Sequence, residues 1–281
     1  MSPVEAVRPR ARISSRFLRS ELRLIAGRRR NQAGMFVLGL VPIIIAVAVK
    51  VSEPGPGQGP DFSSNINSNG LFVPLAALSV EMGMFLPLAI SMLAGDALAG
   101  EANIGTLRYL LTVPVDRTRL LLVKYLSLVV GACWGVLAVA IPGSLIGVAL
   151  FGAGPMTTLS GSQLGVGTAL WRLVLVVLYL SAALAALAAI GLFISSLTEQ
   201  PIAAAIALMI VTILMWILDA TPQVAWLHPW LPVDHFMAFG DFLRDPIAWS
   251  GPLRGLALFA GYAVFFWSLA WARFAGKDIT S

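Results

Sequence analysis

The sequence contains six long stretches that are almost entirely apolar, at about 35–49, 71–94, 121–151, 170–197, 201–218 and 253–272. A helix that crosses a hydrocarbon core of about 30 Å needs about 20 such residues. The stretches are continuous and rich in Ala and Leu, without the period-two alternation of membrane strands. We therefore predict an all-α integral membrane protein with six transmembrane helices, the residues 35–281 forming one transmembrane domain.

The composition excludes the other broad classes of protein. Apolar residues make up 58% of the chain and charged residues only 12%, whereas soluble domains carry about 25% charged residues. The same values exclude a disordered chain. The single cysteine, Cys133, excludes an internal disulfide and a multi-cysteine metal site.

The positive charges predict the orientation of the chain. Nine of the 19 Lys and Arg residues lie in the arm 1–34, four lie between the second and third stretches or at the start of the third, and two lie in the tail after the sixth. Because cytoplasmic loops are enriched in Lys and Arg, we expect a multi-pass protein of the cell membrane with both termini in the cytoplasm. The net charge of +5 then reflects topology rather than nucleic-acid binding.

The basic arm contains a segment, 13–25, that would be amphipathic as a helix. Its apolar side chains cover one half of the helix, while Arg16, Arg19 and Arg23 gather on the other. Such a helix lies in the membrane interface. Two interpretations remain open: a simple anchor, or a lever that connects a soluble partner to the first membrane helix.

The segment 219–252, on the outer side in this topology, is rich in aromatic residues and proline. This pattern predicts short helices that lie at the outer interface or dip partly back into the membrane. An ordinary aromatic belt is the alternative.

The cytoplasmic segment 95–120 is the most informative part of the sequence. Leu107, Leu110 and Leu111 have the spacing of one helix face. Thr106 can cap this short helix, with Gly105 supplying the turn before it, and Pro114 ends it. A short helix with an apolar face is unusual in a simple connection, so we expect it to dock into another protein.

The pattern Glu101-x3-Gly105-Thr106-Leu107-x3-Leu111-x2-Pro114, continuing to Lys124, resembles the permease subunits of type-2 ATP-binding-cassette (ABC) exporters. The resemblance extends to the six-helix layout, the amphipathic N-terminal helix and the outer segment before the last helix. It implies that residues 101–114 hold a coupling helix, which sits in a cleft of a separate cytoplasmic ATPase. The residues implied in this coupling are Glu101, Gly105, Thr106, Leu107, Arg108, Leu111 and Pro114.

The resemblance also implies partners and an energy source. Two permease subunits, as a homodimer or a heterodimer, would form the pathway, and ATP with magnesium would bind to the partner ATPase. This chain has no G-x-x-x-x-G-K-[ST] phosphate-binding loop, so we expect it to bind no cofactor and to have no enzymatic activity of its own. The apolar helices suggest a hydrophobic or amphipathic substrate, and the resemblance implies that it moves outward.

Glu81 lies 10 residues into the second apolar stretch. An ionised carboxylate at that depth costs several kcal/mol unless it is paired. Glu81 is therefore a candidate substrate contact, cation contact or protonation site, or else makes a polar contact with a neighbouring helix. It also supports the alternative function, a proton- or sodium-coupled secondary transporter.

Other chemistry has little support in the sequence. His228, His235, Asp234 and Asp241 resemble metal ligands only by residue type, and we expect no metal site. Asp96 and Glu101 have no neighbouring group that would make them a catalytic pair. No serine-hydrolase pattern occurs. A membrane anchor for a signalling or assembly complex remains an alternative that would keep the docking helix without a pathway.

Overall fold

The computed structural model describes residues 15–52, 69–103, 117–158 and 160–275. Within these ranges, six helices are long and apolar enough to cross a membrane. These are α2 (Arg29–Ser52), α5 (Phe85–Asn103), α7 (Arg117–Phe151), α8 (Val166–Leu197), α9 (Pro201–Asp219) and α10 (Ser250–Ala275). The prediction of an all-α protein with six membrane helices is confirmed.

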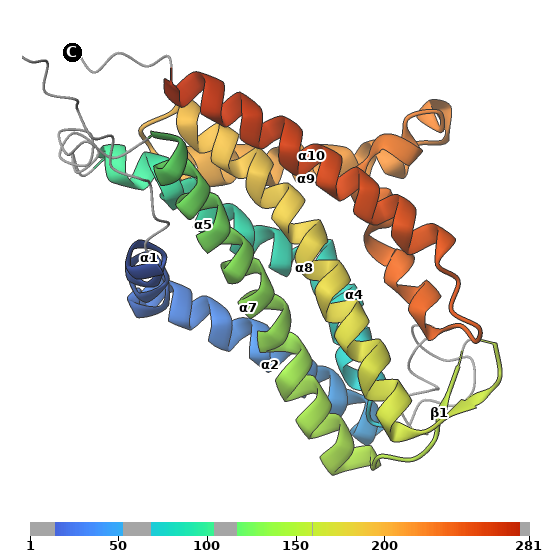
Figure 1. Ribbon diagram of the computed structural model, residues 1–281. Helices are drawn as coiled ribbons and strands as arrows, with labels where there is room; N and C mark the ends of the chain where they lie inside the picture. Colours follow the sequence, from blue (N-terminus) through green and yellow to red (C-terminus); the bar gives the residue numbers. More distant parts are fainter. Residues whose placement is uncertain (1–14, 53–68, 104–116, 159, 276–281) are drawn as a thin grey trace, which may run out of the picture.

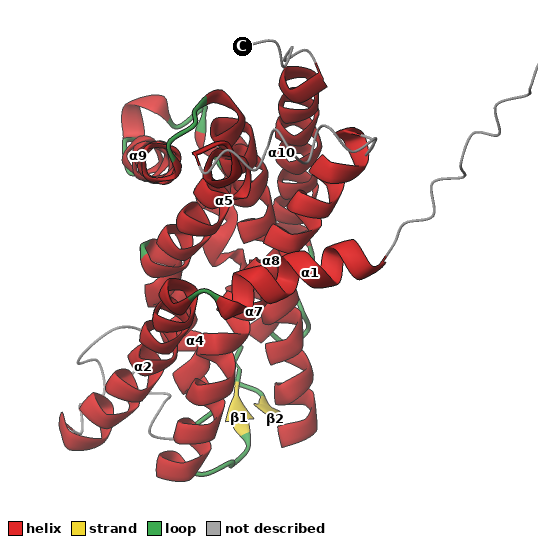
Figure 2. Cartoon of the chain, turned by 90° about the vertical axis from the view of Figure 1, so that its left-hand side faces the viewer, coloured by secondary structure: helices red, strands yellow, loops and turns green. Residues whose placement is uncertain are grey.

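The helices run between two ends of the bundle that differ in character. At one end lie α1 (Ser15–Gly27), the last turn of α5, the first turns of α7 and the end of α10 (Figure 1); we call it the arginine-rich end. At the other lies a short antiparallel hairpin of β1 (Met156–Thr157) and β2 (Gln163–Leu164), which defines the hairpin end. The helix α1 lies crosswise to α10 (Figure 2).

The second apolar stretch forms two helices instead of the one predicted over 71–94. The helix α4 (Phe72–Gly83) ends before Met84, whose backbone lies outside the helical region at φ −149° and ψ −51°, and α5 then begins at Phe85. Pro87 has no N–H to donate to the carbonyl of Gly83, so a continuous helix would lose a hydrogen bond there. The helix α5 also extends nine residues beyond 94, to Asn103. The predicted segment 95–120 therefore begins inside a helix.

The helix α8 lies at the centre of the bundle and packs against α5, α7, α9 and α10. Small residues allow these helices to approach closely. A Cβ added at Gly191 of α8 would lie 2.5 Å from the Cβ of Ala94, and one at Gly95 of α5 would lie 2.6 Å from the carbonyl oxygen of Pro201. The packing of α5, α8 and α9 therefore depends on glycine at these two positions.

At the hairpin end, α4 begins in direct contact with the last turns of α7. A Cβ at either Gly70 or Gly147 would overlap the backbone of the other residue. The side-chain amide of Asn69 donates a hydrogen bond to the carbonyl of Gly154 over 2.6 Å. These contacts fix the start of α4 against α7.

Between the end of α9 and the start of α10, the predicted segment 219–252 forms three 3₁₀ helices, η1 (Pro222–Val224), η2 (His228–Trp230) and η3 (Pro232–Leu243). Phe236, Phe239 and Phe242 of η3 are at most 3% exposed. Arg172 of α8 donates to the carbonyl of Phe242 over 2.9 Å, and the hydroxyl of Tyr179 donates to that of His235 over 2.7 Å. The segment is thus packed onto α8 and α10, and its position relative to a membrane interface remains a prediction.

Candidate functional site

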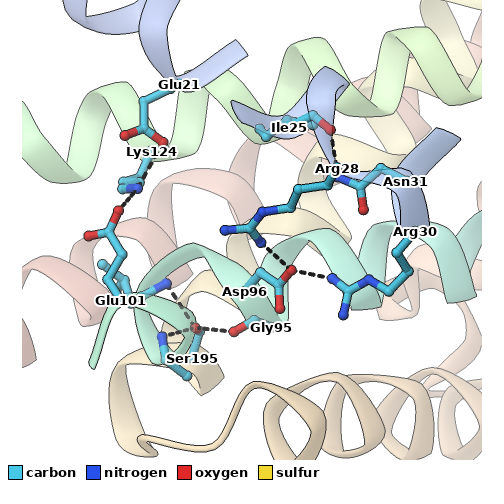
Figure 3. A network of polar contacts seen from close by, with 12 residues as sticks. Glu21, Ile25, Arg28, Arg30, Asn31, Gly95, Asp96, Glu101, Lys124 and Ser195 are labelled. Atoms are coloured by element: carbon cyan, nitrogen blue, oxygen red, sulfur yellow. Dashed lines mark hydrogen bonds and ion pairs between the residues drawn. The ribbon is translucent and has the colours of Figure 1, made fainter. Parts of the chain in front are cut away.

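A buried charge cluster joins three elements at the arginine-rich end. The ammonium of Lys124, on α7, lies 2.8 Å from a carboxylate oxygen of Glu21, on α1. It also contacts the carboxylate of Glu101, near the end of α5. Figure 3 shows Lys124 between the two acids. We call these three residues the Lys124 cluster.

The charges of the cluster interact strongly because the three side chains are largely shielded from water. The Lys124 side chain is only 5% exposed, and those of Glu21 and Glu101 are 10% and 15% exposed. Removing one partner of such a buried pair leaves an uncompensated charge, at a cost of about 3–5 kcal/mol. The three elements are therefore held together at one point, since Lys124 is the shared partner.

A second ionic contact joins the turn between α1 and α2 to α5. Arg28 lies between the two helices and reaches Asp96 of α5 over 2.5 Å, and Arg30 of α2 contacts the same carboxylate oxygen (Figure 3). Both arginine side chains are 46% exposed. Exposed pairs of this kind contribute about 1 kcal/mol or less, so this contact chiefly fixes position.

The turn between α1 and α2 is itself closed by side-chain amides. Asn31 donates to the carbonyl of Ile25 over 2.8 Å, and Gln32 donates to that of Ala26 over 3.0 Å. The last carbonyls of a helix have no partner within the helix. These two amides supply partners and hold α1 at a fixed angle to α2.

The ends of α5 and α8 are also joined at this end of the bundle. The hydroxyl of Ser195, 1% exposed, donates to the carbonyl of Gly95 over 3.0 Å. It also accepts hydrogen bonds from the backbone N–H groups of Leu98 and Ala99, at 3.2 and 2.9 Å. The end of α5 is thus anchored on α1, α7 and α8 at once.

Glu101 is the one predicted coupling residue whose surroundings the structure describes. The other six, Gly105, Thr106, Leu107, Arg108, Leu111 and Pro114, lie outside the described residues. Glu101 lies two residues before the end of α5, and Lys124 lies seven residues after the start of α7. The segment 104–116 therefore connects two helices that the Lys124 cluster holds together. Glu21 and Lys124 were not predicted as partners of Glu101.

Glu81 is a separate feature. Its side chain is fully buried on α4, two residues before that helix ends. Neither carboxylate oxygen has a hydrogen-bond partner among the described residues. The helix α4 contributes no residue to the Lys124 cluster, so the two predicted sites are not one site.

The acidic and histidine side chains of the segment 219–252 make contacts in pairs. Asp241 pairs with Arg244 over 3.0 Å, while His235 lies 3.8 Å from Asp234. Within the described part of the chain, no group of three or more His, Cys, Asp or Glu residues is arranged to hold a metal ion.

Comparison with known proteins identifies the family. Residues 26–227, from the end of α1 to the residue before η2, match the family model described as ABC-2 family transporter protein. No curated protein matches the chain. The match covers more than half of the sequence. It includes Glu101 and Lys124, whereas Glu21 lies before its first residue. The chain therefore belongs to the ABC-2 family of transporters, as a multi-pass permease whose family places ATP hydrolysis in a separate chain.

Proposed function

We propose that this protein is the membrane subunit of an ABC exporter, which moves a hydrophobic or amphipathic substrate outward. A separate cytoplasmic ATPase, binding ATP and magnesium, would supply the energy, and a second permease subunit would complete the pathway. The observation that carries this proposal is the Lys124 cluster, because it joins α1 to the end of α5 and the start of α7, the two helices that the segment 104–116 connects in the sequence.

The length of α7 and the concentration of arginines together support a cytoplasmic position for the arginine-rich end. The 35 residues of α7 span about 52 Å, well beyond the hydrocarbon core of about 30 Å. Part of this helix must therefore lie outside the core. The concentration of arginines favours the cytoplasm for this end, and both termini with it.

The cluster also suggests how motion would pass from the ATPase to the membrane helices. Closure of two ATPase subunits on nucleotide would displace the docked segment 104–116. Because Glu101 and Lys124 flank this segment and are paired, α5 and α7 would move as one body. Glu21 would carry that movement into α1, and the closed turn before α2 would pass it to the first membrane helix. This favours the lever interpretation of α1 over the anchor.

The first experiment is purification of the tagged chain from its native membranes in mild detergent, with magnesium-dependent ATPase activity as the readout. We expect the wild type to carry such an activity and Glu101→Arg to lose most of it, because the arginine would face Lys124 and displace the docking segment. The matched control is Asp234→Arg, a charge reversal on η3 at a side chain that is 38% exposed and does not belong to the Lys124 cluster. It should retain the ATPase.

Two results would contradict the proposal. One is retention of the full ATPase activity by Glu101→Arg. The other is a chain that purifies without an ATPase and yet moves protons or sodium in liposomes. The second result would favour the secondary transporter, against which the family match already weighs.

Glu81 provides a separate prediction about transport. If its buried carboxyl contacts the substrate or a cation, Glu81→Gln should lower the rate of ATP-driven export by about tenfold, the scale of one lost contact of about 1.4 kcal/mol. The amount of folded protein should not fall, because glutamine has nearly the same shape and removes a buried ionisable group. An unchanged export rate in vesicles at equal protein content would assign Glu81 to packing alone.

A further inference from the structure

A cavity of about 380 Å³ lies at the arginine-rich end, beneath the turn between α1 and α2. Its walls come from α2, α5 and α7, through residues such as Met35, Leu38, Leu86 and Ile90. Its volume falls within the range of small-molecule sites in proteins. The Lys124 cluster borders a different, smaller cavity of about 40 Å³.

The interior of the larger cavity is apolar because Leu, Ile and Met side chains line it, and α7 contributes glycines where it faces α5. A Cβ at Gly131 would lie 3.0 Å from a methyl carbon of Leu93, and one at Gly135 would lie 3.4 Å from a methyl carbon of Leu86. Apolar walls that face an unfilled space lose the dispersion contacts of a packed interior. The cavity thus suits a flexible hydrocarbon group.

The rim of the cavity is polar and positively charged. Arg30, Asn31 and Gln32 lie at its edge, and Arg28 and Arg29 precede them in the chain. The amide groups of Asn31 and Gln32 are engaged with the last carbonyls of α1. Arg28 and Arg30 share one carboxylate, that of Asp96, so a net positive charge remains beside the rim. A guanidinium has five N–H donors, so the arginines can bind an anion as well as Asp96.

We propose that this cavity binds one acyl chain of an anionic phospholipid, whose phosphate rests on Arg30. The amphipathic helix α1 belongs in the membrane interface, which puts the rim at the level of lipid head groups and the cavity at that of acyl chains. A lipid of the surrounding leaflet can therefore fill the cavity without leaving the membrane. The bound lipid acts as a wedge that sets the distance between α2 and α5. This proposal does not depend on the ATPase.

Gly34 allows a direct test, since it lines the cavity from α2 and no atom lies within 4 Å of a Cβ added there. Gly34→Phe should fill the cavity without a clash. Gly167→Phe is the matched control, because Gly167 is also helical and open but lies on α8 outside the cavity lining. Delipidated protein is titrated with phosphatidylglycerol and with phosphatidylcholine, and the bound lipid is counted by native mass spectrometry.

We expect one phosphatidylglycerol to bind wild type and Gly167→Phe tightly, and Gly34→Phe to bind it about tenfold more weakly or worse. Arg30→Gln should lose the preference for phosphatidylglycerol over phosphatidylcholine while still binding one lipid, whereas Arg244→Gln, far from the rim, should keep it. Gly135→Leu fills the same cavity from α7 and replaces Gly34→Phe if that variant does not fold.

Three results would overturn the proposal: equal lipid binding by the filled variant and wild type, no difference between the two lipids, or a wild-type dimer that binds no lipid. In the last case a second copy of the chain covers the cavity.

Discussion

Replacing Lys124 with methionine is expected to lower the stability of the folded protein by about 3–5 kcal/mol. Methionine keeps most of the side-chain volume but removes the positive charge that Glu21 and Glu101 share. Two carboxylates would then remain in a nearly dry site, facing each other across the joint between α1 and α5. The midpoint of heat-induced unfolding in detergent should fall by roughly 10 °C.

The loss of stability expected for Lys124→Met arises because two carboxylates stay charged without their partner. Removing all three charges together should cost much less. If Glu21→Gln and Glu101→Gln are added to Lys124→Met, no buried charge is left without a partner, and most of the stability should return. Lys124→Arg keeps the charge and should cost much less than methionine. A Lys124→Met variant as stable as the wild type would contradict the cluster, as would a triple variant no more stable than the single one.

The same series separates the fold from the proposed coupling. The triple variant is expected to be stable and yet to show weakened control of transport by the ATPase, because α1 and α5 no longer share an ionic joint with α7. If the triple variant regains both stability and transport, the cluster serves the fold alone. Export by reconstituted vesicles, measured against ATP hydrolysis in the same sample, distinguishes the two results.

The sequence predicts the membrane helices well because hydropathy is a local property. The third helix is observed over Arg117–Phe151 and the fifth over Pro201–Asp219, close to the predicted 121–151 and 201–218. The first membrane helix begins at Arg29, six residues before the predicted start. Its polar first turn stays helical because side chains there form hydrogen bonds, as Asn31 does with the carbonyl of Ile25. Helix ends depend on such contacts, and hydropathy does not report them.

Features that depend on distant parts of the chain could not be predicted. Lys124 and Glu21 are 103 residues apart in sequence, and no periodicity relates them. In the sequence, Lys124 stands out only as the last residue of the pattern that resembles the ABC exporters. Gly83 and Pro87 flank the break at Met84. Neither residue predicts a break, because membrane helices tolerate both residue types. The strands β1 and β2 have only two residues each, which is too short to show an alternating pattern of polar and apolar residues.

Substituting Gly147 with alanine should destabilise the protein, although alanine is normally the better helix former. Gly147 lies in the last turns of α7, where a Cβ would overlap the carbonyl oxygen of Gly70. Because the obstacle is backbone, no side chain can turn aside, and the start of α4 would have to move. Overpacking of this kind costs about 1–3 kcal/mol or more, and we expect a cost of roughly 3 kcal/mol.

Gly261→Ala provides the opposite case within the same protein. Gly261 lies inside α10, is exposed, and has no atom within 4 Å of an added Cβ. The same substitution there should stabilise the helix by about 0.5–1 kcal/mol, so the two unfolding midpoints should move in opposite directions. Gly70→Ala should resemble Gly147→Ala, and the double variant should cost less than the sum of the two, since both changes disturb one contact. Equal midpoints for Gly147→Ala and Gly261→Ala would mean that α4 is not fixed against α7. Glu81 would then lie on a helix free to shift, and its buried position could not be attributed to this contact.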